Sequence, residues 1–169
     1  MATFAEEGID AALAALLRES GLTVALAESC SGGLISKRIT DIPGSSDYFL
    51  LGAVTYANSA KTEVLGVAEE LLIRHGAVSR EVALAMACGV RDRAGSDLGL
   101  STTGIAGPEG GSRDKPVGTV YIALADPGGC QVHCYRFEGG RDKVREMTAT
   151  VALELLYSRL MEIVKNNSA

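Results

Sequence analysis

The stretch TVALAESCSGGLISKRI, residues 23–39, holds the transition on which the fold depends. Its first five residues are small or branched and mostly apolar, which is typical of a short buried strand. Gly32 and Gly33 then follow a polar segment, and apolar side chains return at helical spacing from Leu34 to Ile39. We therefore predict a strand, a tight turn and a helix in immediate succession.

The same patterns extend in both directions from this stretch. They predict further helices near 5–18, from 58, and near 69–74, 80–93 and 140–164, and further strands near 48–56, 97–103, 117–125 and 131–137. The segment Asp126-Pro127-Gly128-Gly129 is a hairpin turn between the last two strands. Because helices and strands first alternate and the hairpin comes late, we expect an α/β fold, a three-layer αβα sandwich with a mixed, mostly parallel sheet and a late antiparallel hairpin. The length fits a single domain over residues 1–169.

Composition narrows the class of function. Hydrophobic residues make up 47% and charged residues 22% of the chain, as in ordinary soluble globular proteins. No apolar run approaches the roughly 18 to 20 residues that cross a bilayer, and the N-terminus is acidic, unlike a signal peptide, so we expect a cytoplasmic protein without a membrane partner. A net charge of -5 and the absence of tryptophan argue against nucleic-acid binding, which needs a basic face or stacking platforms. A small-molecule ligand fits better.

The four cysteines predict neither a disulfide framework nor a metal centre. Cys130, His133 and Cys134 suggest zinc, but they lie in a strand-like run in which the two cysteines would be about 13 Å apart at roughly 3.3 Å per residue. Thiolates that share a zinc ion lie within about 4 Å of each other. We expect reduced thiols, no metal and no cofactor.

Ligands collect at the carboxyl ends of strands in open α/β sheets, which points to the segments 28–33, 56–61 and 104–116. Gly32 and Gly33 open a helix, and unpaired N–H groups at such a turn can hold a phosphate or stabilise an oxyanion. In a second interpretation, Ser31 simply caps the helix.

Three adjacent side chains, Ser29, Cys30 and Ser31, are candidate nucleophiles, although their spacing matches neither the Gly-x-Ser-x-Gly elbow nor the Walker loop. An attacking serine needs a base. His75 suits a helix C-terminus and His133 suits a hairpin strand, so a structural role fits both histidines. Lysine is left as the base.

Lys61 falls in the first turn of the helix that opens near residue 58, where the helix dipole opposes its charge and lowers its pKa. To act as a base near neutrality, that pKa must fall from about 10.4 to about 7 or 8, which burial in a pocket supplies. The hydroxyl of Tyr56, at the preceding strand end, can orient or relay a proton.

The segment 104–116 (GIAGPEGGSRDKP) is a long glycine-rich loop after a strand. It lacks Gly-x-Gly-x-x-Gly spacing and contains two prolines, so it is not a dinucleotide fingerprint; its amides either approach a ligand closely or form a surface turn. Arg141 and Arg145, one turn apart in the closing helix, either present a forked cation to a phosphate or lie exposed.

Six blocks of sequence together resemble the CinA C-terminal-domain family. In chain order they are AESCSGG (27–33), ITDIPGSSDYF (39–49), VTYANSAK (54–61), HGAVS (75–79), TGIAGPEGGSRDKPVGTVY (103–121) and FEGGRDKVR (137–145). Stand-alone members of this family are known as nicotinamide mononucleotide (NMN) deamidases. The resemblance implies hydrolysis of the carboxamide of NMN to nicotinate mononucleotide and ammonia, without metal or cofactor.

The resemblance also implies which residues do the work. Ser29, Tyr56 and Lys61 match the catalytic positions of the family. The expected substrate-binding residues are Ser31, Gly32, Gly33, Ser46, Gly104, Ala106, Gly107 and Arg141. The expected partner is a pyridine mononucleotide, and we expect a homo-oligomer, a dimer or larger.

Two alternatives stay open at this point. Cys30 is the rival nucleophile, with Glu28 and Lys61 as partners, the residue types that nitrilase-like amidases use. Alternatively, the chain is a non-catalytic nucleotide-binding accessory protein linked to competence or DNA damage, as the historical name of the family indicates.

Overall fold

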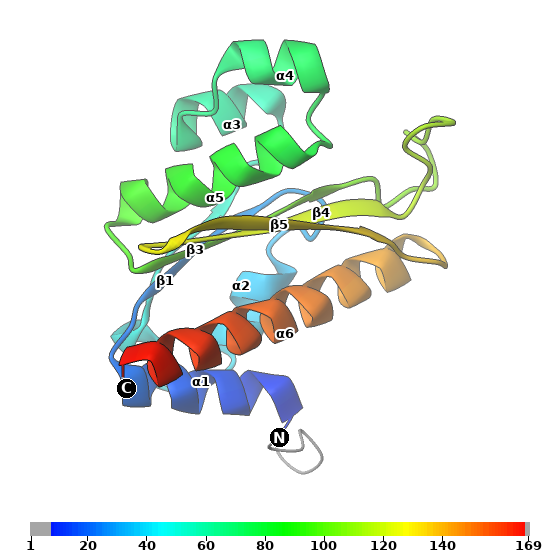
Figure 1. The fold of residues 1–169 in the computed structure, drawn as a ribbon. Coiled ribbons are helices and arrows are strands. Elements are labelled where there is room, and N and C mark those ends of the chain that lie inside the picture. The colour runs from blue at the N-terminus through cyan, green and yellow to red at the C-terminus, as the bar shows by residue number, and fades with distance from the viewer. Residues whose placement is uncertain (1–7, 168–169) are drawn as a thin grey trace.

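The computed structural model describes residues 8–167, which fold into a five-stranded sheet with helices on both faces (Figure 1). The strands are β1 (Val24–Glu28), β2 (Phe49–Val54), β3 (Leu98–Gly104), β4 (Thr119–Asp126) and β5 (Gly129–Arg136). The helices are α1 (Gly8–Ser20), α2 (Leu34–Thr40), α3 (Asn58–Leu65), α4 (Glu69–His75), α5 (Arg80–Ala94) and α6 (Arg141–Asn167), with a short 3-10 turn η1 (Ser45–Asp47). The predicted order of elements is confirmed; residues 5–7 of the first predicted helix lie outside the described residues.

The strand order is β2-β1-β3-β4-β5. β1 pairs in parallel with both β2 and β3, whereas β3 with β4 and β4 with β5 are antiparallel. Four strands therefore point in one direction and β4 runs against them. The late hairpin turns at Pro127-Gly128, because Asp126 pairs with Gly129 across it. The expected mixed sheet is confirmed.

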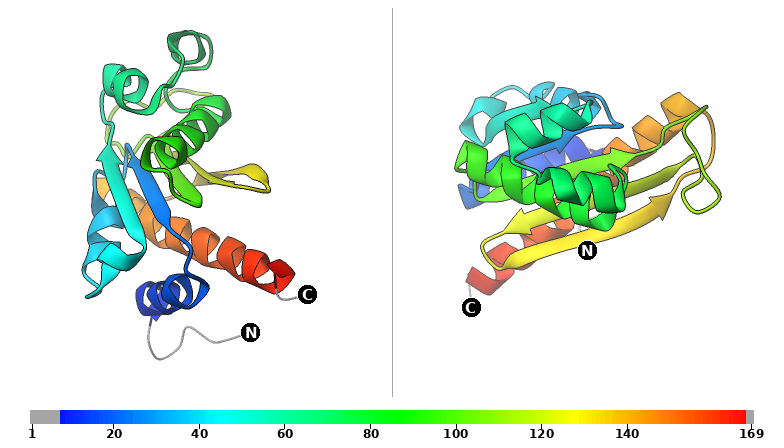
Figure 2. Two further views of the ribbon diagram at one scale, coloured as in Figure 1. Left: turned by 90° about the vertical axis from the view of Figure 1, so that its left-hand side faces the viewer. Right: turned by 90° about the horizontal axis from the view of Figure 1, so that it is seen from above.

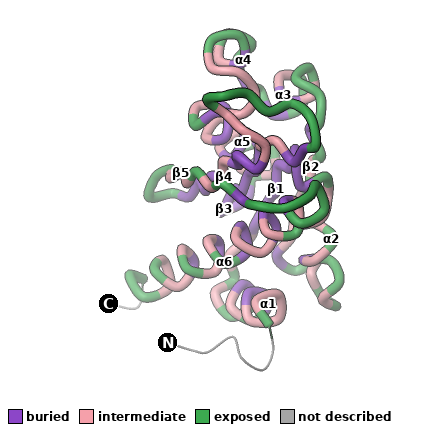
Figure 3. Tube along the Cα trace, turned by 90° about the vertical axis from the view of Figure 1, so that its right-hand side faces the viewer, coloured by how far each residue is buried: buried purple, intermediate pink, exposed green. Residues whose placement is uncertain are grey.

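Two helical layers enclose the sheet, α1, α2 and α6 on one face and α3, α4 and α5 on the other (Figures 1 and 2). The larger core cluster lies between the sheet and the first of these layers. It includes Leu17, Leu26, Ile122 and Leu153, which are fully buried. Figure 3 shows the inward side of α6 buried and much of the outer surface of α3 and α4 exposed. The three-layer αβα arrangement follows from this packing.

α5 packs closely on the sheet because small residues line the contact. Ala83 and Ala87 face Ala123 and Ala125, all fully buried. At Gly99 of β3, a Cβ atom would lie 2.2 Å from the carbonyl oxygen of Ala87, so a larger residue there would push the helix away. This close approach fixes the distance between α5 and the antiparallel half of the sheet.

The parallel strands β2, β1 and β3 end at the same edge of the sheet. In register, Glu28 at the end of β1 pairs with Val54 of β2 and Thr102 of β3. The segments that follow these strands, which the sequence singled out, therefore meet at one edge with the β1 turn in the middle. Among residues 8–167, no helix is both long enough and apolar enough to cross a membrane.

Candidate active site

The turn after β1 presents Ser29 at the carboxyl edge of the sheet. The Ser29 amide donates to the carbonyl of Thr102 (3.0 Å), and the amide of Gly32 donates back to the carbonyl of Ser29 (3.1 Å). Gly32 and Gly33 have φ angles of 62° and 91°, a region that glycine adopts without the steric strain other residues meet. The chain can therefore reverse within a few residues and leave the Ser29 side chain at the mouth of the turn, 8% exposed.

The carboxylate of Glu28, not the Ser31 hydroxyl, caps α2. Its oxygens accept hydrogen bonds from the amides of Gly33 (3.0 Å), Ile35 (3.2 Å) and Ser36 (2.8 Å) and from the hydroxyls of Ser31 (2.7 Å) and Ser36 (2.6 Å). Glu28 is 1% exposed, so this negative charge sits at the positive end of the helix, out of water. The interpretation of Ser31 as the helix cap is therefore wrong, since its hydroxyl points to Glu28 and to Thr102 (2.8 Å).

The same network corrects the expected role of the two glycine amides. The amide of Gly33 is held by Glu28 and that of Gly32 by the Ser29 carbonyl, so neither is free to bind an oxyanion or a phosphate. Sequence reasoning missed this because a carboxylate one residue before the nucleophile reads as a chemical partner rather than as a cap. Ser31, Gly32 and Gly33 thus shape the turn from behind Ser29.

Lys61 lies directly against the nucleophile candidate. Its Nζ is 3.2 Å from the Oγ of Ser29, 2.7 Å from the carbonyl oxygen of Thr55 and 3.3 Å from that of Tyr56. The residue is 1% exposed, and this burial lowers the pKa of its amine from the ordinary lysine value, against an opposing effect of the nearby Cys30. The sequence analysis named Ser29 and Lys61 as candidate nucleophile and base, and the structure places their side chains in contact.

The hydrogen-bond partner of the Tyr56 hydroxyl is Arg141 rather than Ser29 or Lys61. The hydroxyl accepts a hydrogen bond from Nη2 of Arg141 (2.8 Å), and the side chain is 60% exposed. Arg141 also donates through Nη1 to the carbonyl of Gly107 (2.9 Å). Tyr56 contacts Lys61 through its backbone carbonyl instead, so its ring orients the arginine rather than the lysine.

The two arginines at the start of α6 have different partners. Arg141 faces the cleft, whereas Arg145 donates through Nε (3.3 Å) and Nη2 (3.1 Å) to the carbonyl of Ser31. Arg145 therefore holds the turn from the α6 side while Glu28 holds it from within. The predicted fork of two arginines toward one phosphate is not formed.

A cleft of about 200 Å³ opens over Ser29 and Lys61. It is lined by Ser29, Cys30, Tyr56, Asn58, Lys61, Ala77, Val78, Thr103, Gly104, Ala106 and Arg141. The sequence did not single out Asn58, Thr103, Ala77 or Val78, although all four lie within the quoted blocks. Only their positions could have pointed to them. Asn58 and Thr103 lie at or just after the ends of β2 and β3, and Ala77 and Val78 lie in the connection between α4 and α5.

One expected site residue lies elsewhere. Ser46 is exposed in η1, just before β2, whereas the cleft lies beyond the other end of that strand. The length of β2 lies between Ser46 and the cleft, so Ser46 does not line the cleft of its own chain.

Cys30 lines the cleft, but its surroundings favour the unreactive thiol form over the thiolate. It is 5% exposed, and burial, reinforced by the charge of Glu28, raises the pKa of its thiol to about 12. The histidines are outside the cleft, since His75 ends α4, with its Nδ1 3.6 Å from a Glu81 carboxylate oxygen, and His133 lies in β5. Within the described residues, no group of three or more His, Cys, Asp or Glu side chains is placed to hold a metal ion.

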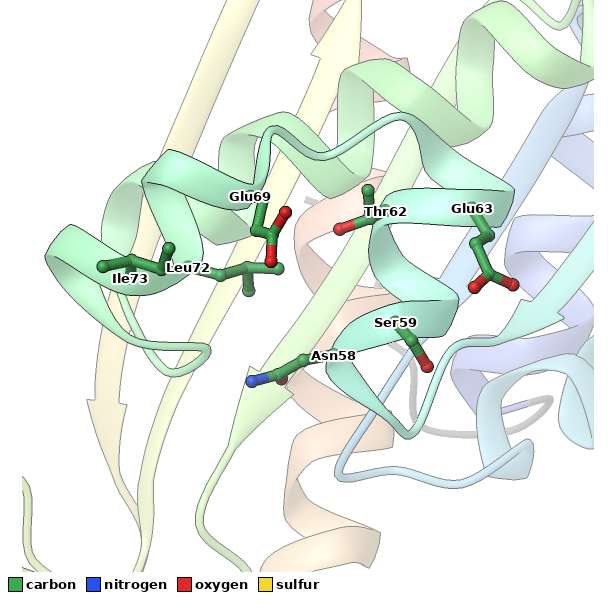
Figure 4. Close-up of a pocket in the computed structure, with 7 residues that line it drawn as sticks. All are labelled: Asn58, Ser59, Thr62, Glu63, Glu69, Leu72 and Ile73. Carbon is green, nitrogen blue, oxygen red and sulfur yellow. The ribbon is translucent and has the colours of Figure 1, made fainter.

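A larger cavity, of about 380 Å³, lies between α3 and α4 (Figure 4). Its walls are Asn58, Ser59, Thr62, Glu63, Glu69, Leu72 and Ile73. The lining carries the hydroxyls of Ser59 and Thr62 and the carboxylates of Glu63 and Glu69, but no thiol and no lysine. Asn58 is shared with the smaller cleft, but the contact between the Ser29 hydroxyl and the buried Lys61 amine belongs to the smaller cleft.

Comparison with known proteins identifies the family of the chain. Residues 6–160 match the family model described as the CinA C-terminal domain. The CinA-like proteins of Geobacter sulfurreducens and Geobacter metallireducens are 64% and 62% identical over 90% and 92% of this chain. The chain spans only 37% and 38% of the length of these two relatives.

Solved structures give the same result. The competence/damage inducible protein CihA of Agrobacterium tumefaciens is 42% identical, with a TM-score of 0.86 over 94% of this chain and 98% of that one. A CinA superfamily protein of Klebsiella pneumoniae is 31% identical, with a TM-score of 0.88 over 91% and 96% of the two chains. On its sequence, its fold and its extent of match, this chain belongs to the CinA C-terminal domain family.

Proposed function

We propose that this chain hydrolyses the carboxamide of nicotinamide mononucleotide to nicotinate mononucleotide and ammonia, with Ser29 as nucleophile and Lys61 as base. The observation that carries the reaction class is the 3.2 Å contact between Ser29 Oγ and the buried Lys61 Nζ. The choice of a pyridine mononucleotide rests on the resemblance to the NMN deamidases of the family.

The surroundings of Lys61 support a neutral amine that accepts a proton. A neutral amine has two N–H groups and one lone pair, and the carbonyls of Thr55 and Tyr56 can engage both N–H groups. The lone pair is then directed to the third neighbour, the hydroxyl of Ser29. Burial favours the neutral form, which is the form a base requires.

The reaction then proceeds in two halves. Ser29 Oγ attacks the carboxamide carbon as its proton passes to Lys61, and the carbonyl oxygen becomes an oxyanion. Lys61 returns the proton to the nitrogen, which leaves as ammonia, and an acyl-serine remains. Water, deprotonated by the same amine, attacks this ester; nicotinate mononucleotide leaves and Ser29 regains its proton.

The amide of Cys30 is the oxyanion donor in this proposal. Within residues 8–167 it donates to no oxygen and faces only the Cys30 thiol, a weak acceptor. It directly follows the nucleophile, and the amide after the nucleophile fills this role in α/β hydrolases. Gly104 keeps space nearby, since a Cβ atom there would lie 3.0 Å from the Cys30 sulfur.

The cleft suits one end of the substrate. Its volume of about 200 Å³ is below the roughly 300 Å³ at which drug-sized ligand pockets begin, so it would receive the pyridine ring and its carboxamide. The ribose and phosphate would extend to the rim. A guanidinium has five N–H donors, and Arg141 uses one each on Gly107 and Tyr56, which leaves donors for a phosphate.

The rival nucleophile is less well placed. A thiol whose pKa is raised to about 12 holds almost no thiolate near neutrality, and Glu28, its supposed partner, accepts five hydrogen bonds as the cap of α2. Neither observation favours Cys30.

The test is ammonia release from nicotinamide mononucleotide by the purified chain, with and without a chelator. We expect turnover in both conditions, a loss of roughly 10³-fold or more in Ser29→Ala and at most a modest loss in Cys30→Ala. Near-native turnover by Ser29→Ala would rule out the mechanism. Tight binding of the mononucleotide with no ammonia release from the wild-type chain would instead support the accessory-protein alternative.

A further inference from the structure

A second group of reactive side chains lies far from the cleft. Cys88 of α5 and Cys130 at the start of β5 place their Sγ atoms 3.0 Å apart, about 1 Å more than the bond of a disulfide. Both are free thiols. Cys130 pairs with Ala125 near the hairpin turn, at the edge of the sheet opposite Gly104.

The packing of α5 explains why these thiols meet. Ala87, the residue before Cys88, is fully buried against the sheet, and Gly99 permits its carbonyl to approach closely. The partly buried Cys88 packs on the same cluster, which includes Val132, two residues after Cys130 on the same face of β5. The contact is therefore held by a helix and a paired strand rather than by loops.

The two thiols differ in access to solvent. Cys130 is exposed, so a small molecule can reach its sulfur. Cys88 lies beneath it, and burial, together with the contact to Cys130, raises the pKa of the Cys88 thiol to about 11. Cys130 is therefore the sulfur that meets an incoming reagent, and Cys88 is the one that resolves the product.

We propose that Cys88 and Cys130 form a dithiol site for thiol–disulfide exchange, which takes a small-molecule disulfide of the glutathione type and closes to an intramolecular disulfide. The Cys130 thiolate attacks one sulfur of the reagent, forms a mixed disulfide and releases one thiol. The Cys88 sulfur, on losing its proton to solvent, attacks Cys130 Sγ and releases the second thiol. The two protein thiols are oxidised, the reagent is reduced to two thiols, and excess thiol reverses the reaction.

The closed site ties α5 to the β4–β5 hairpin across 42 residues of sequence. A cross-link over such a loop restricts the unfolded chain, which raises the melting temperature, by roughly 5 to 15 °C for a chain of this size. The effect is on stability, because neither cysteine lines the catalytic cleft.

The test treats the reduced full-length chain with oxidised glutathione and measures intact mass, disulfide-linked peptides and melting temperature. We expect a mass lower by two hydrogen atoms, a single linked peptide pair containing Cys88 and Cys130, and a higher melting temperature that dithiothreitol reverses. Separate glutathionyl groups on the two cysteines, an unreacted Cys130 or a link between two chains would overturn the proposal.

Three serine variants identify the sulfur atoms. Cys88→Ser should stop at one glutathionyl group on Cys130, and Cys130→Ser should form no cross-link. Cys134→Ser is the matched control, because Cys134 is exposed on the same face of β5 and contacts Tyr121 instead of a thiol. It should close as the wild type does; failure of this control to close, or closure in either of the other variants, would contradict the assignment. The intact mass, the linked peptides and the melting temperature are all independent of amidase activity.

Discussion

The proposed reaction depends on Lys61 as its base, and the burial of this residue predicts a measurable pH dependence of the reaction rate. The unprotonated amine is the active form, and desolvation lowers its pKa from the ordinary value of about 10.4. We therefore expect kcat/KM for nicotinamide mononucleotide to rise with pH up to a plateau reached below that ordinary value. Lys61→Arg, which stays protonated, should lose roughly 10²- to 10⁴-fold at every pH. A flat wild-type profile over the acidic range would contradict a lysine base.

The same shift links Lys61 to stability. Its folded-state pKa is below its unfolded-state pKa, so between the two values the unfolded chain binds more protons. The free energy of unfolding of the wild type, compared with that of Lys61→Met, should therefore rise with pH through this window. Denaturant titrations of both proteins at several pH values would measure the difference.

Single residues also mark the limit of sequence reasoning. The first-turn position of Lys61 and the strand end before Ser29 were readable from local patterns, because both depend on near neighbours. The contact between the Tyr56 hydroxyl and Arg141 was not predictable in this way, because the two residues are 85 positions apart in the chain. Contacts of that separation depend on how layers pack, which a single sequence does not encode locally.

At the scale of elements, the unit from β1 through the turn to α2 is organised by one buried carboxylate. The strand and helix were predictable from apolar spacing, but the cap was not, since serine and glycine are the residues normally expected at a helix start. Glu28 replaces them with acceptors for three amides and two hydroxyls. The nucleophile turn and the helix are therefore stabilised together.

Glu28→Gln tests this unit. A carboxamide has one acceptor oxygen, and its NH₂ group would face at least one backbone N–H of α2, which is left unsatisfied in a buried site. We expect a loss of about 2 to 3 kcal/mol in the free energy of unfolding, with a fall in turnover beyond that of the control. Glu70→Gln, at an exposed first-turn position of α4, is the control and should change stability by less than about 0.5 kcal/mol. Equal stability of the two variants would show that Glu28 is not the cap we describe.

At the scale of the whole molecule, the net charge argues against direct DNA binding, which the names of the relatives, with their references to competence and damage, could suggest. A net charge of -5 provides no general attraction for phosphates. We expect this chain to bind a fluorescent DNA duplex more weakly than the roughly 10⁻⁴ to 10⁻⁶ M of ordinary non-specific binders, and lowering the salt concentration should not restore binding. Anisotropy titrations at two salt concentrations would decide this, and a steep salt dependence would revive the accessory-protein alternative.

The Glu28 network also bears on how the molecule reaches its working form. The partners of this carboxylate lie three to eight residues away, whereas Lys61 lies 32 residues from Ser29. Contacts between near neighbours close short loops with little entropy loss and tend to form early in folding, and distant contacts follow once the layers dock. The nascent chain would then shape its serine turn before the lysine arrives. On the proposed function, the newly made protein would stay inert until Lys61 reaches Ser29, so the onset of amide hydrolysis would report the last stage of folding.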